Sequence, residues 1–109
     1  MTEPPANLFD AVPAGLADEQ VLELAAGAEV RIERIVSCGQ ASPPGFWYDQ
    51  DGAEWVALLQ GGAAVEFADG RRVRLRPGDH LTIAAHARHR VAWTSSDPPA
   101  IWLAVHYPG

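Results

Sequence analysis

Apolar and polar residues alternate along most of the chain after residue 30, in short runs separated by turn residues. A period of two is typical of a β-strand that buries one face. Pairs such as Gly61-Gly62 and Pro77-Gly78 interrupt the runs and indicate tight turns. The pattern predicts strands at residues 30–37, 46–50, 54–60, 63–68, 71–76, 80–84, 89–94 and 101–107. Short strands at this spacing, without long helices between them, are typical of an all-β sandwich or barrel.

The first 29 residues have a different pattern, in which three prolines break up an extended arm. Residues 18–26 then predict a short helix, because Asp18 can cap its start, apolar residues supply one side and Gly27 can close it. We therefore expect residues 1–29 to form an arm with a short helix, packed on a sheet edge or on a partner subunit. Residues 30–109 are expected to form the barrel.

The composition fits one small globular domain. The 109 residues are 48% hydrophobic and 20% charged, which is ordinary for a folded domain and unlike a disordered chain. The first 15 residues hold no basic residue and no apolar run, so we expect neither a signal peptide nor a membrane anchor. The single cysteine, Cys38, leaves no internal disulfide, and a cytoplasmic protein is the simple interpretation.

Charge is distributed unevenly, although the formal net charge is only −6. Residues 1–69 carry twelve acids and two arginines, whereas residues 70–109 carry two acids and six arginines. The later arginines alternate with apolar residues, which places them on the outer face of half-buried strands. We expect no nucleic-acid partner, because the net acidity of the chain would repel phosphate.

Two segments carry the candidate chemistry. The first runs from Gly45 to Gly61, and six residues separate Glu54 from Gly61 within it. The second opens with a Pro-Gly-Asp turn at residues 77–79 and continues through Ile83 to His89. In spacing and turn residues, over about fifty positions, the two segments resemble the paired motifs of the cupin superfamily.

This resemblance implies a jelly-roll β-barrel that holds a divalent metal, commonly iron, manganese, nickel or zinc, in its mouth. In that family the ligands are two histidines and a glutamate of the first motif and one histidine of the second. Glu54 and His89 match the last two positions. The paired histidines do not match: their places fall on Tyr48 and Gln50 with one spacing, or on Trp47 and Asp49 with the other.

A first-row metal site needs roughly three or four protein ligands, so Glu54 and His89 require at least one more. Asp49 is the best replacement, because a carboxylate binds hard or borderline cations where tryptophan and tyrosine seldom do. Gln50 offers only a neutral amide oxygen, and it points away from Asp49 on a regular strand. The sequence leaves the choice between these two residues open.

Further residues are expected around the same cavity. His106 shares a strand face with Trp102, and both are predicted to line it together with Tyr48 and Gln50. His86 is a candidate for the rim, although on an extended backbone it would point away from His89 three residues later. Asp49 and His106 are the candidates for moving protons.

Two functions follow as expectations. The first is a metal-dependent enzyme acting on a small polar metabolite, such as a dioxygenase, isomerase, decarboxylase or lyase, with the metal polarising an oxygen or activating water or dioxygen. The second is a metal-free cupin that binds or senses a small molecule without catalysis, as the missing histidine pair suggests. The N-terminal arm and the open sheet edges predict a homodimer.

Overall fold

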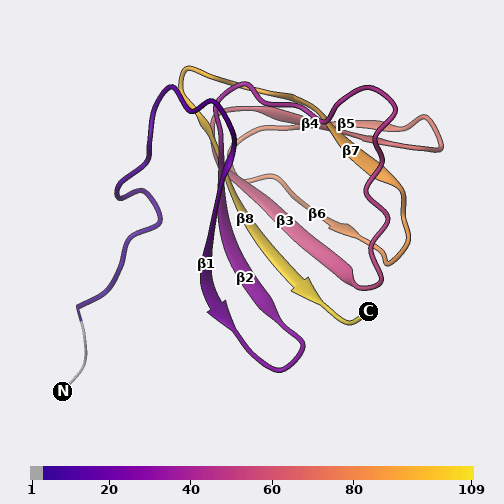
Figure 1. The fold of residues 1–109 in the computed structure, drawn as a ribbon, viewed down its shortest axis with the longest axis horizontal. Helices are drawn as coiled ribbons and strands as arrows, with labels where there is room; N and C mark the ends of the chain where they lie inside the picture. Colours follow the sequence, from indigo (N-terminus) through magenta and orange to yellow (C-terminus); the bar gives the residue numbers. More distant parts are fainter. Residues whose placement is uncertain (1–3) are drawn as a thin grey trace.

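The computed structural model describes residues 4–109, and all of its regular elements are strands (Figure 1). They are β1 (Gln20–Ala26), β2 (Arg31–Ser37), β3 (Ala53–Gln60), β4 (Ala63–Phe67), β5 (Arg72–Leu75), β6 (His80–Ile83), β7 (His89–Thr94) and β8 (Ala100–Tyr107). A five-stranded sheet has the order β1-β2-β8-β3-β6, and a three-stranded sheet has the order β5-β4-β7. The predicted all-β jelly roll is confirmed. No helix long and apolar enough to span a membrane is found in the described part of the chain.

The core lies between the two sheets and is built from alternate residues of the strands. On β4, Val65 and Phe67 are buried while Glu66 faces outward. On β5, Arg72 and Arg74 are exposed and alternate with Val73 and Leu75, as the sequence pattern predicts. The buried cluster comprises Val56, Leu58, Ala63, Val65, Phe67, Leu75, Ile83, Ala100, Trp102 and Ala104.

The Gly61-Gly62 turn between β3 and β4 is fixed by close packing. Gly61 has a φ of 79°, and a Cβ atom there would lie 2.9 Å from the carbonyl oxygen of Pro99. A Cβ atom on Gly62 would lie 2.9 Å from the ring of Trp93, while its N–H donates to Ser95 Oγ at 3.0 Å. Only glycine fits both positions without displacing its neighbours.

The predicted helix at residues 18–26 is wrong, because Gln20–Ala26 forms the edge strand β1 and pairs antiparallel with β2. Pairing with β2 satisfies backbone groups along this segment, and this long-range interaction overrides the weak local helix signals. The preceding arm is held by Arg34, which is 4% exposed. Its guanidinium donates to the carbonyl oxygen of Asp10 at 2.7 Å and to Gln20 Oε1 at 3.0 Å.

The predicted strand at residues 46–50 is not a regular strand. Tyr48 forms a single antiparallel bridge with His89, in which Tyr48 N donates to His89 O at 2.7 Å and His89 N donates to Tyr48 O at 3.1 Å. The Pro-Pro-Gly segment before it and the turn at residues 51–52 prevent a longer ladder. The other predicted strands agree with the structure to within one residue at each end.

Candidate functional site

A cavity of about 230 Å³ opens between the two sheets. Strands of both sheets and the segment around Tyr48 supply its walls. Its polar lining consists of Glu19, Arg31, Glu33, Tyr48, Gln50, Glu54, His89 and His106. Its apolar lining consists of Val21, Ile35, Val56, Val65, Ile83, Val91 and Trp102. A larger hollow of about 710 Å³ lies outside, near the turn at residues 26–31, and shares only Arg31, Gln50 and His106 with this cavity.

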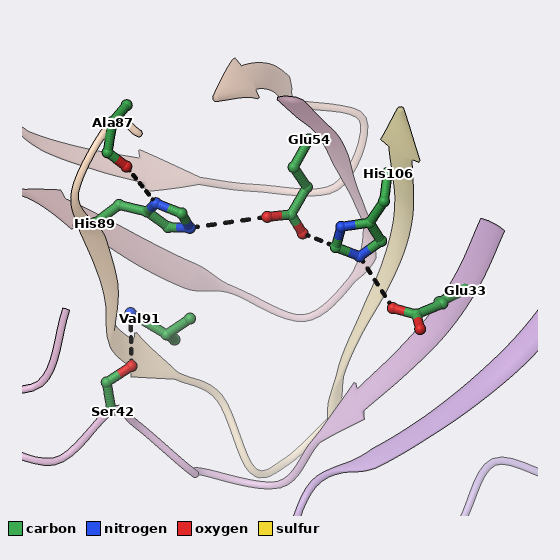
Figure 2. A network of polar contacts seen from close by, with 7 residues as sticks. All are labelled: Glu33, Ser42, Glu54, Ala87, His89, Val91 and His106. Carbon is green, nitrogen blue, oxygen red and sulfur yellow. Dashed lines mark hydrogen bonds and ion pairs between the residues drawn. The ribbon is translucent and has the colours of Figure 1, made fainter. Parts of the chain in front are cut away.

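Glu54, near the start of β3, lines the cavity and is 8% exposed. Figure 2 shows its carboxylate between two imidazole rings: Oε1 lies 3.7 Å from His89 Nε2, and Oε2 lies 3.8 Å from His106 Nε2. Both contacts are longer than hydrogen bonds. Burial raises the pKa of Glu54, and the adjacent His106 and His89 rings partly oppose this effect. The carboxyl group is therefore poised to hold or release a proton inside the cavity.

His89 begins β7 and is 5% exposed. Its Nδ1 lies 2.8 Å from the carbonyl oxygen of Ala87, which can only accept, so Nδ1 carries a proton. In the neutral ring, Nε2 is then an acceptor that faces Glu54. The ring of Tyr48 stacks on His89, with centroids 5.4 Å apart and planes at 25°.

His106 is placed beside Glu54 by the register of the large sheet, because the two residues are direct partners across β3 and β8. Its Nε2 lies 3.1 Å from Glu33 Oε1 on β2, and Glu33 Oε2 accepts from Arg31 Nε at 2.7 Å. Since a carboxylate accepts only, the His106 Nε2–H donates to Glu33. Glu33 thereby fixes the orientation of His106. Glu33 was not identified from the sequence. The only sequence signal is the alternation of polar and apolar residues along β2, which does not say which face of the strand points inward.

Four of the polar lining residues form one row across the cavity. It runs from the Ala87 carbonyl through His89, Glu54 and His106 to Glu33 (Figure 2). In the same view Val91 N donates to Ser42 Oγ at 3.0 Å, which ties the proline-containing loop to β7. The titratable members lie within 4 Å of one another, but only His106 and Glu33 form a hydrogen bond, so a group bound in the cavity is needed to link Glu54 to either imidazole.

Tyr48 and Gln50 line this cavity, together with Trp102 and His106. The structure therefore selects the spacing that puts Tyr48 and Gln50 at the positions of the missing histidine pair. Burial, together with the charges of Glu19 and Glu54, raises the pKa of Tyr48. Its hydroxyl stays protonated and can donate to a ligand.

Asp49 and His86, by contrast, lie outside the cavity and bind each other. Asp49 Oδ1 is 2.7 Å from His86 Nδ1, and the two side chains are 50% and 64% exposed. Asp49 points away because it alternates with Tyr48 and Gln50, so it does not join Glu54 and His89 as the sequence suggested. His86 has a φ of 61° in the turn before β7, which directs its side chain away from His89. The Asp49 carboxylate raises the pKa of His86.

The donor set does not fit the divalent metal site that the resemblance implies. Among residues 4–109, no three His, Cys, Asp or Glu side chains converge as a group that could hold a metal ion. His89 and His106 approach different oxygens of Glu54, and the histidine-pair positions hold Tyr48 and Gln50. A protonated phenol and a neutral amide are poor ligands for these metals. The arrangement is suited instead to hydrogen bonding and proton transfer.

Residues 35–106 match the family described as "Cupin domain". A crystal structure of a "putative mannose-6-phosphate isomerase" from Ralstonia eutropha JMP134 is similar over 98% of this chain and 100% of that chain, at 48% identity and a TM-score of 0.93.

Two more distant structures share the fold. A cupin superfamily protein from Desulfitobacterium hafniense DCB-2 is 22% identical with a TM-score of 0.81, over 100% of this chain and 94% of that chain. A conserved protein of unknown function from Streptococcus pyogenes is 16% identical with a TM-score of 0.77, over 100% of this chain and 90% of that chain. No curated protein matches the chain.

Proposed function

Because the chain belongs to the cupin family through its match over residues 35–106, we propose that it binds a small polar metabolite between its sheets and transfers protons on it. The proposal rests on the position of Glu54, a buried carboxyl group that lies between His89 and His106 inside the cavity. The reaction that uses such a group most directly is the isomerisation of a hydroxycarbonyl compound. The Ralstonia relative, described as a "putative mannose-6-phosphate isomerase", supports the isomerase class.

The proposed reaction needs no oxidant and no metal. Glu54 removes a proton from the carbon beside the ligand carbonyl, so that a C–H bond breaks and a C=C bond forms. The carbonyl oxygen thereby becomes an enediolate oxygen. His89 Nε2, which is an acceptor in the neutral ring, takes the proton of the neighbouring hydroxyl and passes it to this oxygen. Glu54 then returns its proton to the former carbonyl carbon, which yields the isomeric carbonyl compound. Glu33 acts as a positioning residue for His106 through the 3.1 Å contact.

The metal-dependent alternative assigns Glu54 and His89 as ligands of iron, manganese, nickel or zinc. It requires a third donor, and Asp49 is turned outward onto His86. The metal-free interpretation is therefore favoured. Adding EDTA to the exchange assay tests the metal-dependent alternative at the same time.

The test is exchange of the α-hydrogen in D₂O. Glyceraldehyde, dihydroxyacetone, mannose and fructose are each incubated with the protein, and ¹H NMR follows loss of the signal beside the carbonyl. Exchange is expected with at least one compound, unchanged by EDTA, and roughly 100-fold or more slower in Glu54→Gln. The exchange rate is also measured for His89→Asn. Its matched control is His80→Asn, because His80 lies at the exposed end of β6. Exchange with none of the four, or exchange that EDTA abolishes, contradicts the proposal.

We also propose that the protein is a homodimer formed through β1. This strand is an edge of the large sheet, and Val21, Leu22 and Leu24 on it are 52%, 46% and 42% exposed. An open edge that carries exposed apolar side chains favours pairing with another strand. The indigo segment at residues 4–19 precedes this edge and extends to the left of β1 in Figure 1. We also propose a cytoplasmic location, because the single cysteine, Cys38, leaves no internal disulfide.

A further inference from the structure

The charges that face the cavity are mostly negative. Glu19, Glu33 and Glu54 line it, and among its described residues Arg31 is the only arginine. The chain has no lysine, and the six arginines after residue 70 do not contribute to the lining. Those arginines lie elsewhere, for example beside Glu66 and over the Trp93 ring.

Arg31 is also committed to a partner. Its Nε donates to Glu33 Oε2 at 2.7 Å, and its side chain is 49% exposed at the rim. A phosphate placed there would lie beside the Glu33 carboxylate and would have to compete with it for the guanidinium. Phosphate sites usually combine several cations or free backbone N–H groups, and one shared arginine provides little compensation for a dianion.

Glu54 supplies an independent observation. Its side chain is 11% exposed, and the contacts of its two oxygens, at 3.7 and 3.8 Å, are too long for hydrogen bonds. It is therefore an acceptor, aimed into the cavity, that a ligand donor would satisfy. A hydroxyl or ammonium group can donate to it, whereas a phosphate dianion cannot.

Cavity size points in the same direction. A volume of about 230 Å³ is below the roughly 300–1,000 Å³ of pockets that hold drug-sized ligands. It favours a compact ligand over one extended by a phosphate group.

We propose that this site selects an unphosphorylated hydroxycarbonyl compound and that the carboxylates at its mouth repel phosphate esters. The inference rests on the proposed function, because it names the substrate class of the same cavity. A dianion within about 7 Å of one uncompensated carboxylate, at an effective dielectric constant of about 20, should bind at least roughly tenfold more weakly than its neutral parent. Glu19 is such a carboxylate, since its hydrogen bond comes from the neutral Ser37 hydroxyl at 2.9 Å.

The experiment compares mannose with mannose 6-phosphate, and dihydroxyacetone with its phosphate. Binding is followed through the imidazole NMR signals of His89 and His106. We expect the neutral compound of at least one pair to shift these signals with a Kd at least roughly tenfold lower than that of its phosphate. Added salt should narrow the difference, because screening weakens the repulsion.

Glu19→Gln keeps the acceptor for Ser37 and removes one charge from the mouth, so it should reduce the discrimination. Asp51→Asn removes an exposed charge that does not line the cavity and should leave the discrimination unchanged. Equal or tighter binding of the phosphate overturns the inference, and so does an absence of response to every compound. Failure of the proposed reaction appears separately: the neutral compound then binds with the expected preference but shows no α-hydrogen exchange.

Discussion

Replacing Glu54 with glutamine should make the protein more stable while it removes the proposed chemistry. The wild-type carboxylate is buried, and its nearest imidazole contacts are 3.7 and 3.8 Å away. Burial disfavours the charged form of this carboxylate, and its oxygens face the cavity without a hydrogen-bond donor in the protein. Glutamine keeps the shape and removes the charge. At pH 8 we therefore expect Glu54→Gln to gain on the order of 1 kcal/mol in free energy of unfolding.

The sign of the pH dependence follows from the raised pKa of Glu54, which burial causes. In the pH range between the ordinary and the raised pKa, the folded state binds this proton and the unfolded state has lost it. Wild-type stability must therefore fall, relative to Glu54→Gln, as the pH rises through that range. At pH 4, below the ordinary pKa of 4.5, both states are mostly protonated, and most of the advantage of the variant should disappear.

Urea unfolding of both proteins at pH 4 and pH 8 measures this difference, with α-hydrogen exchange recorded at pH 8. Glu29→Gln, on the exposed turn between β1 and β2, is the matched control and should change neither quantity. A variant that is less stable than wild type at pH 8 but equal to it at pH 4 would refute the reasoning. It would mean that the two histidines stabilise the carboxylate by more than burial costs it.

Three further predictions test other parts of the molecule. Asp49 raises the pKa of His86, so their contact should stabilise the folded protein below the ordinary pKa of 6.5. This stabilisation should be lost as the pH rises through the raised pKa. In thermal unfolding, Asp49→Asn should not show this pH-dependent loss of stability. Leu24→Lys should convert a dimer into an 11.7 kDa monomer in light scattering, whereas a wild type that is already monomeric would contradict the β1 interface. The double variant Tyr48→His with Gln50→His should bind about one equivalent of Zn²⁺ or Mn²⁺ by elemental analysis, where wild type binds less than about a tenth, because it supplies the two missing imidazoles.

Most strands could be predicted because each is marked locally, by alternation and by the turn residues that bound it. The edge strand β1 could not. Its residues Val21, Leu22 and Leu24 satisfy a helix pattern as well as a strand pattern, and the choice depends on backbone pairing with β2, which is distant in sequence. Local signals at Asp18 and Gly27 therefore favoured an element that the sheet edge excludes.

The same distinction holds for the candidate site: residues marked by a local motif could be predicted, and residues placed by distant pairing could not. Glu54 and His89 were recognisable because fixed spacings from Gly61 and from the Pro-Gly-Asp turn mark them. The choice between Asp49 and Gln50 depends on one backbone bridge, between Tyr48 and His89, that sets which side chains of the loop face inward.

Glu33 was invisible for a related reason: it matters only because the register of β2 and β8 brings it to His106. In a β-sandwich the partners of a titratable group come from strands far apart in the sequence. Motif spacing can therefore locate the central carboxyl group, but whether that group acts as a metal ligand or as a proton carrier depends on neighbours that only the sheet register supplies. In this protein those neighbours are two imidazoles on opposite sides of one carboxylate, and the proposed proton transfer rests on that arrangement.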